Sequence, residues 1–241
     1  MKEVTVVYQL FGYGELGESA REVAKQWVLD DPFRSESFQD DCNSELEILF
    51  PRSELGVQYS LGYCQGDGLN IYGKLCLDDF LDLLDGRNDI HDGWVEDARS
   101  RVSERTIATV RWCIDKNTDV CKNMVELPKN NRYAYCMADR ISFADDWIES
   151  GMLCDDEEIP EPFSIPDGMD NGSVADAFHE FEKVLRKCIS ALAHIMEKEG
   201  YRTLVDGDEE EIMEICDTHG WMFLSDGTFF GTAEDEENNV Q

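Results

Sequence analysis

Apolar residues recur at helical spacing in several stretches of the chain. Between Ala20 and Val28 they stand at i, i+3, i+4, i+7 and i+8, which predicts an amphipathic helix that ends at Pro32. Ser-x-x-Asp capping signatures begin two more helices, at Ser142 and Ser173. The apolar spacing predicts further helices over residues 77–84, 94–114, 173–200 and 208–219.

Alternation of apolar and polar residues predicts the strands. Residues 57–63 and 69–75 alternate in this way, and the sequence Cys-Gln-Gly-Asp-Gly between them suits a hairpin turn. Further strands are predicted over residues 4–8, 45–50, 132–138, 221–224 and 228–230, the last two as a final hairpin. The order of elements predicts an α+β fold with a mostly antiparallel sheet packed by amphipathic helices. Residues 1–75 and 132–138 are expected to share that sheet.

The pattern predicts a single domain over residues 1–232. Residues 151–172 form an acidic loop, because Asp, Glu, Pro and Gly dominate there and prolines prevent regular structure. Residues 233–241 are expected to be a disordered acidic tail.

Charge changes the picture more than any single motif. The chain has 53 Asp and Glu against 21 Lys and Arg, a formal net charge of -32 over 241 residues. Residues 143–182 contain thirteen acids and no Lys or Arg. A globular surface normally mixes both signs, because charge of one sign repels itself and destabilises the compact state. The excess therefore indicates a use beyond solubility.

The charge is comparable with that of a short DNA duplex. A charge of this size equals that of about 16 base pairs, or about 54 Å of helix. A folded chain of this length has a diameter of about 45 Å. Imitation of nucleic acid is therefore physically possible, and the alternative is a surface that is merely acidic.

The predicted partner-binding residues are carboxylates from two acidic stretches. Apolar Trp147, Ile159 and Phe163 are interleaved with the first stretch, where Lys and Arg interleave on an ordinary solvated face. Acids give electrostatic steering and apolar anchors give residence, so the composition favours docking in a basic groove. The predicted residues are Asp145, Asp146, Glu149, Asp155, Asp156, Glu157, Glu158, Glu161, Asp208, Glu209, Glu210 and Glu211.

Two glycine-rich or acidic segments allow other interpretations. The turn at residues 65–68 can be an anion- or metal-binding loop, but Asp-Gly between alternating strands favours a structural hairpin turn. The run at residues 208–211 can bind calcium, but it lacks EF-hand spacing and suits the first turn of a helix.

Catalytic constellations are not evident in the sequence. None of the four histidines stands in His-Glu-x-x-His, and Gly-x-Ser-x-Gly and Cys-x-x-Cys do not occur. Paired carboxylates occur throughout, so they carry no information about hydrolytic chemistry. We therefore predict no catalytic residue, no cofactor and no metal ligand, and expect the protein not to be an enzyme.

Location is predicted from two further observations. No run of about eighteen apolar residues exists, and the first residues lack the apolar stretch of a signal peptide. The nine cysteines are scattered among apolar residues, which is typical of reduced, buried thiols. Both observations predict a cytoplasmic protein.

Three segments resemble one large, mostly uncharacterised family of small acidic proteins encoded by phages, prophages and other mobile elements. The segments are YQLFGYGELGESAREVAKQW, VQYSLGYCQGDGLNIYG and EGYRTLVDGDEEEIMEICDTHGWMFLSDGTFF, about a third of the chain. The resemblance implies a cytoplasmic protein in a phage setting. It also favours interference with host enzymes that act on nucleic acids.

The sequence thus leads to three hypotheses. The first is a phage-type anti-defence inhibitor, an acidic nucleic-acid mimic that blocks the DNA- or RNA-binding channel of a host restriction or CRISPR nuclease. The second is an antitoxin-like or regulatory protein that binds a basic partner, and the third is a metal-dependent enzyme. The first predicts a basic, nucleic-acid-binding host protein as partner, with no direct binding to nucleic acid or membrane. The oligomeric state is left open.

Overall fold

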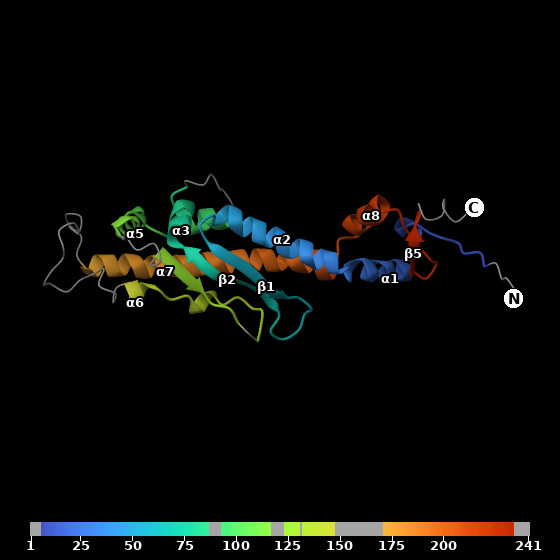
Figure 1. Ribbon diagram of the computed structural model, residues 1–241, viewed down its shortest axis with the longest axis horizontal. Coiled ribbons are helices and arrows are strands. Elements are labelled where there is room, and N and C mark those ends of the chain that lie inside the picture. The colour runs from blue at the N-terminus through green and yellow to red at the C-terminus, as the bar shows by residue number, and fades with distance from the viewer. Residues whose placement is uncertain (1–5, 87–92, 117–122, 131, 148–170, 234–241) are drawn as a thin grey trace. The chain divides into compact units, whose positions relative to one another are not determined.

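The computed structural model describes residues 6–86, 93–116, 123–130, 132–147 and 171–233 (Figure 1). Contacts divide the chain into two compact units, each described by itself below. The terminal unit combines residues 1–38 with 198–241, and the central unit comprises residues 39–197. The single domain predicted over residues 1–232 stays a prediction; within the terminal unit, segments from both ends of the chain pack around a common core.

The terminal unit consists of short helices and one hairpin. Its elements are η1 (Tyr13–Glu15), α1 (Glu18–Leu29), the π-helix η5 (Tyr201–Asp206), α8 (Glu209–Thr218), β4 (Trp221–Phe223) and β5 (Phe229–Thr232). The structure confirms the helix predicted over residues 20–28, the helix over 208–219 and the antiparallel hairpin. The core contains Tyr13, Leu16, Ala20, Ala24, Val28, Leu29, Ile212, Cys216 and Phe223.

Aromatic rings close one side of this core. Trp27 stacks on Phe229 with ring centroids 4.1 Å apart and an angle of 7° between the rings. Trp221 meets Trp27 edge-on at 5.0 Å. Because these rings come from α1 and from both hairpin strands, they join the N-terminal and C-terminal segments of the unit.

The first predicted strand is wrong where the structure describes it. Residues 6–10 have no regular secondary structure, and Val7 is 90% exposed. Only Phe11 pairs, through an isolated bridge with Phe223. Among the residues described, β4 has only three residues, and its bridge to this segment is made by Phe11, after the β-branched run.

The central unit contains the main sheet. Strands β1 (Glu54–Ser60), β2 (Gly68–Cys76) and β3 (Met124–Leu127) are antiparallel in the order β1-β2-β3. Val57 pairs with Ile71, as the alternation requires. The predicted α+β class, with antiparallel sheets and amphipathic helices, is confirmed, but residues 6–10 do not join this sheet, and residues 1–5 lie outside the described residues.

The helix α2 (Pro32–Leu49) corrects two predictions. The sequence analysis ended a helix at Pro32 and placed a strand at residues 45–50, whereas Pro32 opens α2 and the helix runs on to Leu49. Proline suits the first turn of a helix, because N–H groups there have no acceptor within the helix and the missing N–H of proline costs no hydrogen bond. Phe38, Cys42, Leu46 and Leu49 are buried at intervals of four, four and three residues, so the apolar run is one face of a helix.

The strand predicted at residues 132–138 is also wrong. The third strand of the sheet is β3. Residues 132–138 are instead linked to β2 by the side chain of Asn70, which is fully buried. Asn70 Nδ2 donates to the carbonyl oxygen of Pro128 at 2.9 Å, and its Oδ1 accepts from the Met137 N–H at 2.8 Å. The Ala134 N–H also donates to the Gly66 carbonyl oxygen at 3.1 Å, so isolated hydrogen bonds take the place of a ladder.

Helices surround the sheet of the central unit. They are α3 (Leu77–Leu84), α4 (Gly93–Ser100), α5 (Glu104–Lys116), η3 (Ala138–Arg140), α6 (Ala144–Trp147) and α7 (Asn171–Gly200). The helices predicted over 77–84 and 173–200 are confirmed. The one predicted over 94–114 is two helices, because Ser103 Oγ accepts from the Thr106 N–H at 3.0 Å and so begins a new helix.

The cysteines described are free thiols. Five of them are buried, Cys136 is half-buried and Cys64 is exposed in the β1–β2 turn. The prediction of mostly buried thiols is confirmed for this set; Cys121 and Cys154 lie outside the described residues.

Candidate protein-binding surface

Half of the predicted partner-binding residues can be placed. Asp145 and Asp146 lie on α6 in the central unit, and residues 208–211 lie at the start of α8 in the terminal unit. The other six lie outside the described residues: Glu149, Asp155, Asp156, Glu157, Glu158 and Glu161.

Most carboxylates in the first turn of α8 make hydrogen bonds or ion pairs within the protein. Asp208 is the N-cap, and its Oδ1 accepts from the backbone N–H groups of Glu210 at 2.9 Å and Glu211 at 3.2 Å. Glu209 pairs with Arg21 at 3.3 Å. These contacts support the first-turn interpretation over a calcium loop, and they take carboxylates away from an external partner.

Glu211 has an internal role of the same kind. It pairs with Arg34 and with Arg202, each at 3.1 Å. Arg34 also donates to the carbonyl oxygen of Thr203 in η5, at 2.7 Å. Of the four acids, Glu209 and Glu211 form ion pairs and Asp208 caps the helix, whereas no ion pair of Glu210 with a described residue is seen.

A buried carboxylate positions α6. Glu182 of α7 is 7% exposed, and its Oε2 accepts from the backbone N–H groups of Phe143 at 2.7 Å and Ala144 at 2.8 Å. Arg186 donates to Glu182 Oε1 and, through Nε, to the carbonyl oxygen of Ile141 at 2.6 Å. The start of α6 is therefore fixed to α7 by a paired and fully bonded charge.

This clamp holds the two acids of α6 at the surface. Asp145 and Asp146 are exposed, and the side chain of Asp145 keeps 73% of its accessible area. Its Oδ1 lies 3.6 Å from His179 Nε2. At this distance and exposure the pair contributes little to stability, so Asp145 is available to a partner.

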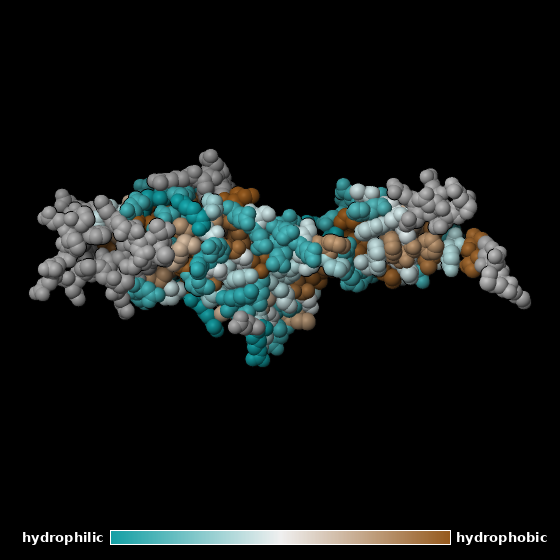
Figure 2. Space-filling view, in the orientation of Figure 1, coloured by the Kyte–Doolittle hydropathy of each residue, from teal (hydrophilic) through white to brown (hydrophobic). Residues whose placement is uncertain are grey.

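The sequence analysis missed an acidic ridge on α2. The α2 ridge consists of Asp40, Asp41, Glu45 and Glu47, all exposed and all within the central unit. Asp40 and Glu47 stand two helical turns apart, about 10 Å along the axis, which is about three base steps of a DNA strand. Figure 2 shows mostly hydrophilic residues over the side of α2 that faces the viewer.

An apolar residue stands beside the α2 ridge. Ile48 is 71% exposed although it lies next to the buried Leu49. Ile48 follows Asp41 by seven residues and Glu45 by three, so the three side chains share one side of the helix. The helix that carries the ridge could have been predicted from the apolar residues at positions 38, 42, 46 and 49. The sequence analysis instead predicts a strand over residues 45–50.

Two arginines of the central unit pair with carboxylates of α3. Arg52 donates through Nε to the fully buried Asp79 at 2.6 Å and also pairs with Asp82. Arg111 pairs with Asp82 at 3.1 Å and with Asp85 at 2.7 Å. These pairs bind α3 to the β1 turn and to α5. Because these two arginines are paired with acids of α3, they do not neutralise the exposed acids elsewhere on the unit.

The terminal unit has the same imbalance. Its 82 residues include 6 Lys and Arg against 20 Asp and Glu, a formal net charge of -14. Both units are therefore acidic in their own right, and the excess of acids is not confined to residues 143–182.

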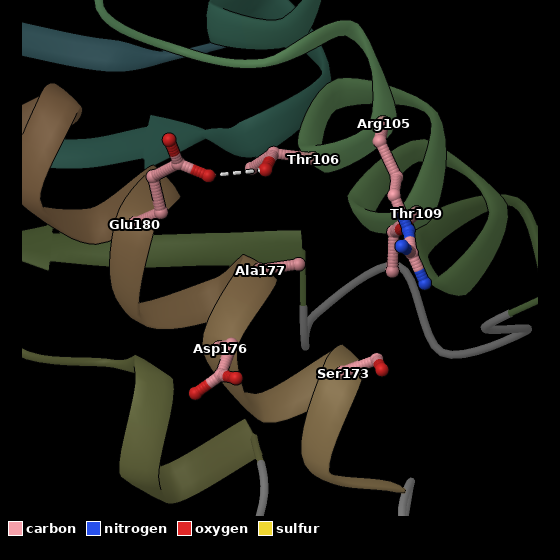
Figure 3. A pocket seen from close by; sticks show the side chains of 7 residues that line it. All are labelled: Arg105, Thr106, Thr109, Ser173, Asp176, Ala177 and Glu180. Atoms are coloured by element: carbon pink, nitrogen blue, oxygen red, sulfur yellow. Dashed lines mark hydrogen bonds between the residues drawn. The ribbon is translucent and has the colours of Figure 1, made fainter. Parts of the chain in front are cut away.

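A small polar pocket lies between α5 and α7 (Figure 3). It has a volume of ≈ 200 Å³ and is lined by Arg105, Thr106, Thr109, Ser173, Asp176, Ala177 and Glu180. Thr106 donates to Glu180, and Figure 3 shows the Arg105 side chain beside Thr109 and turned away from that pair. The lining contains hydroxyl groups and carboxylates but no histidine or cysteine.

The turn at residues 65–68 is structural. Asp67 accepts from the Cys64 N–H at 2.6 Å and from the Ser60 hydroxyl at 2.8 Å. These hydrogen bonds hold the pKa of Asp67 below its usual value. Gly66 has a φ of 96°, and a Cβ there would lie 2.2 Å from the Tyr133 ring. The geometry supports the hairpin-turn interpretation over an anion or metal loop.

Within the ranges described, no three His, Cys, Asp or Glu residues are grouped so that they could hold a metal ion. Within the same ranges, no helix combines the length and apolarity needed to cross a membrane.

Comparison with known proteins gives no family for the chain. No family model matches it, and neither the curated proteins nor the solved structures include a significant match. The resemblance to acidic phage proteins stays a prediction.

Proposed function

We propose that the protein is a phage-type anti-defence inhibitor without enzymatic activity. Its carboxylate surface occupies the nucleic-acid channel of a basic host nuclease, of the restriction or CRISPR type, in the host cytoplasm. It takes the place of the nucleic acid and needs no cofactor. The observation that carries the proposal is the α2 ridge, where exposed acids line one helix with Ile48 beside them.

Physical chemistry supports this use of the ridge. Exposed acids steer a basic partner over a Debye length of about 8 Å at physiological salt. Steering raises the association rate, whereas residence depends on desolvated apolar contacts. Ile48 and the acids of the ridge supply both on a single rigid helix.

The test is inhibition of DNA binding by a panel of restriction and CRISPR nucleases across a salt series. The variant replaces Asp40, Asp41 and Glu47 by Asn, Asn and Gln. Three charges within one groove contact, at about 1 kcal/mol each, predict roughly a hundredfold weaker inhibition at low salt. The difference should shrink as salt is added, because the lost interaction is electrostatic.

A matched control removes the same charge elsewhere. Asp115, Glu126 and Asp139 are exposed acids on α5, β3 and η3, and their replacement by Asn, Gln and Asn should leave inhibition within about threefold. Equal inhibition by both triple variants would refute a role for the ridge. Salt-dependent binding to a small basic protein without competition from DNA would favour the antitoxin-like alternative.

A further inference from the structure

The pocket between α5 and α7 carries opposite charges on its two walls (Figure 3). Both helices belong to the central unit. Arg105 lies on the α5 wall, and Asp176 and Glu180 lie on the α7 wall. The two acids are four residues apart, so they share one side of α7.

Arg105 supplies a cation without a partner. It makes no ion pair with any residue that the structure describes, although most of the described arginines do. The residue is exposed, and Figure 3 shows its guanidinium beside Thr109, across the pocket from the two acids. Its donors are therefore available to a ligand in the pocket.

The acids of the opposite wall are not neutralised either. Asp176 is exposed and makes no ion pair within the described part of the chain. Glu180 is half-buried, and the hydroxyl of the buried Thr106 donates to it across the two helices. This hydrogen bond fixes the position of one carboxylate but leaves its charge in place. The pocket thus keeps a cation and two anions apart.

These charges decide which ligand fits. A simple anion is attracted by Arg105 but repelled by Asp176 and Glu180, and a simple cation meets the reverse. A molecule with a carboxylate at one end and an ammonium group at the other is attracted by both walls. The pocket volume of ≈ 200 Å³ suits a molecule smaller than a typical drug. A small free α-amino acid has this combination of charge and size.

We propose that the pocket between α5 and α7 binds a small free α-amino acid. Its carboxylate accepts hydrogen bonds from the Arg105 guanidinium, and its ammonium group donates to Asp176 and Glu180. The bound molecule joins the two helices and stabilises the central unit by mass action. The pocket shares no residue with the α2 ridge, so nuclease inhibition and amino-acid binding are tested by separate variants, and either can fail alone.

The experiment titrates the full-length protein with L-serine, observed through the methyl resonances of Thr109 and Ala177. L-serine should give saturable shifts with a dissociation constant in the millimolar range, because the contacts are open to solvent. Glycine should bind within about threefold of L-serine, because the groups recognised are common to all α-amino acids.

Two half-ligands separate the two contacts. Ethanolamine is L-serine without its carboxylate, and 3-hydroxypropionate is L-serine without its ammonium group. Each should bind roughly tenfold more weakly than L-serine, because it loses one charged contact and meets repulsion from the opposite wall. A half-ligand that binds as tightly as L-serine would overturn the proposal, as would the absence of saturable shifts with L-serine and glycine.

The variants test the same contacts from the side of the protein. Arg105→Gln should weaken L-serine roughly tenfold without weakening ethanolamine, and Asp176→Asn should weaken L-serine severalfold without weakening 3-hydroxypropionate. Both should keep the wild-type melting temperature, because neither side chain forms an ion pair among the described residues. The control is Arg140→Gln, which removes an exposed arginine of η3 and should change neither affinity. Equal affinity of the Arg105 variant and the wild type for L-serine, or equal weakening by the control, would refute the site.

Discussion

Glu182 holds the backbone of Phe143 from a position 39 residues away in the chain. The same carboxylate oxygen also takes the Ala144 N–H, so the first turn of α6 is capped by a side chain from α7. The exposed acids of α6 therefore depend on a buried one for their position.

Replacing Glu182 by Ala should destabilise the protein by about 3 kcal/mol. The change leaves two buried N–H groups and the Arg186 guanidinium without their acceptor. Glu182→Gln keeps the shape and one acceptor oxygen, so its cost should be smaller. Urea unfolding of both variants measures the difference, and equal free energies of unfolding for wild type and the Ala variant would contradict the clamp.

Replacing Asp208 by Ala should cost about 1 kcal/mol. The side chain caps α8 through the N–H groups of Glu210 and Glu211. Asp208→Asn keeps an oxygen in the same place and should retain most of the stability. Thermal unfolding of the pair is the measurement, and an Asn variant as unstable as the Ala variant would argue against the cap.

Stability should fall as pH rises above 9. Burial raises the pKa of Cys113 to about 11, of Cys188 to about 12 and of Cys216 to about 11, all from 9.0. The unfolded chain then releases protons before the folded one, so stability is complete below pH 9 and is lost between pH 9 and about 12.

The size of the alkaline effect follows from the shifts. Two pH units are worth about 2.7 kcal/mol per thiol. Urea unfolding at intervals from pH 8 to 11 measures the slope, and Cys113→Ala should make it shallower. A flat profile would show that the thiols are accessible to solvent.

Replacing Gly66 by Ala should destabilise the central unit by about 2 kcal/mol or more. An alanine must adopt the left-handed backbone and its Cβ meets the Tyr133 ring. Gly93→Ala is the control, because a Cβ there meets nothing within 4 Å. Comparison of melting temperatures separates the two, and a Gly66 variant as stable as the Gly93 variant would refute the close approach.

Local patterns predicted the elements that depend on neighbours in sequence. The hairpin of β1 and β2, the helix α3 and the long helix α7 follow from periodicity and turn residues. The prediction failed at α2 for two reasons. Proline can follow the end of one helix or occupy the first turn of the next, and a six-residue apolar run does not distinguish a strand from a buried helix. It failed at residues 132–138 because the hydrogen bonds come from Asn70, a residue more than sixty positions earlier.

The sequence predicts that the candidate surface is acidic, but it does not show which of the acids form ion pairs within the protein. The acids of α8 were found, but the ion pair between Arg34 and Glu211 joins residues 177 positions apart. No local pattern indicates that pairing. Which carboxylates remain for a partner is decided by tertiary contacts.

The terminal unit can fold only late in the synthesis of the chain. Its core needs Ala24 and Val28 from the first helix together with Ile212 and Phe223 near the other end. On the ribosome the first helix must wait with its apolar face uncovered until nearly the whole chain has been synthesised. The central unit has no such delay, since its strands and helices emerge consecutively. An interrupted translation product would therefore carry an exposed apolar helix, which marks it for chaperones and proteases.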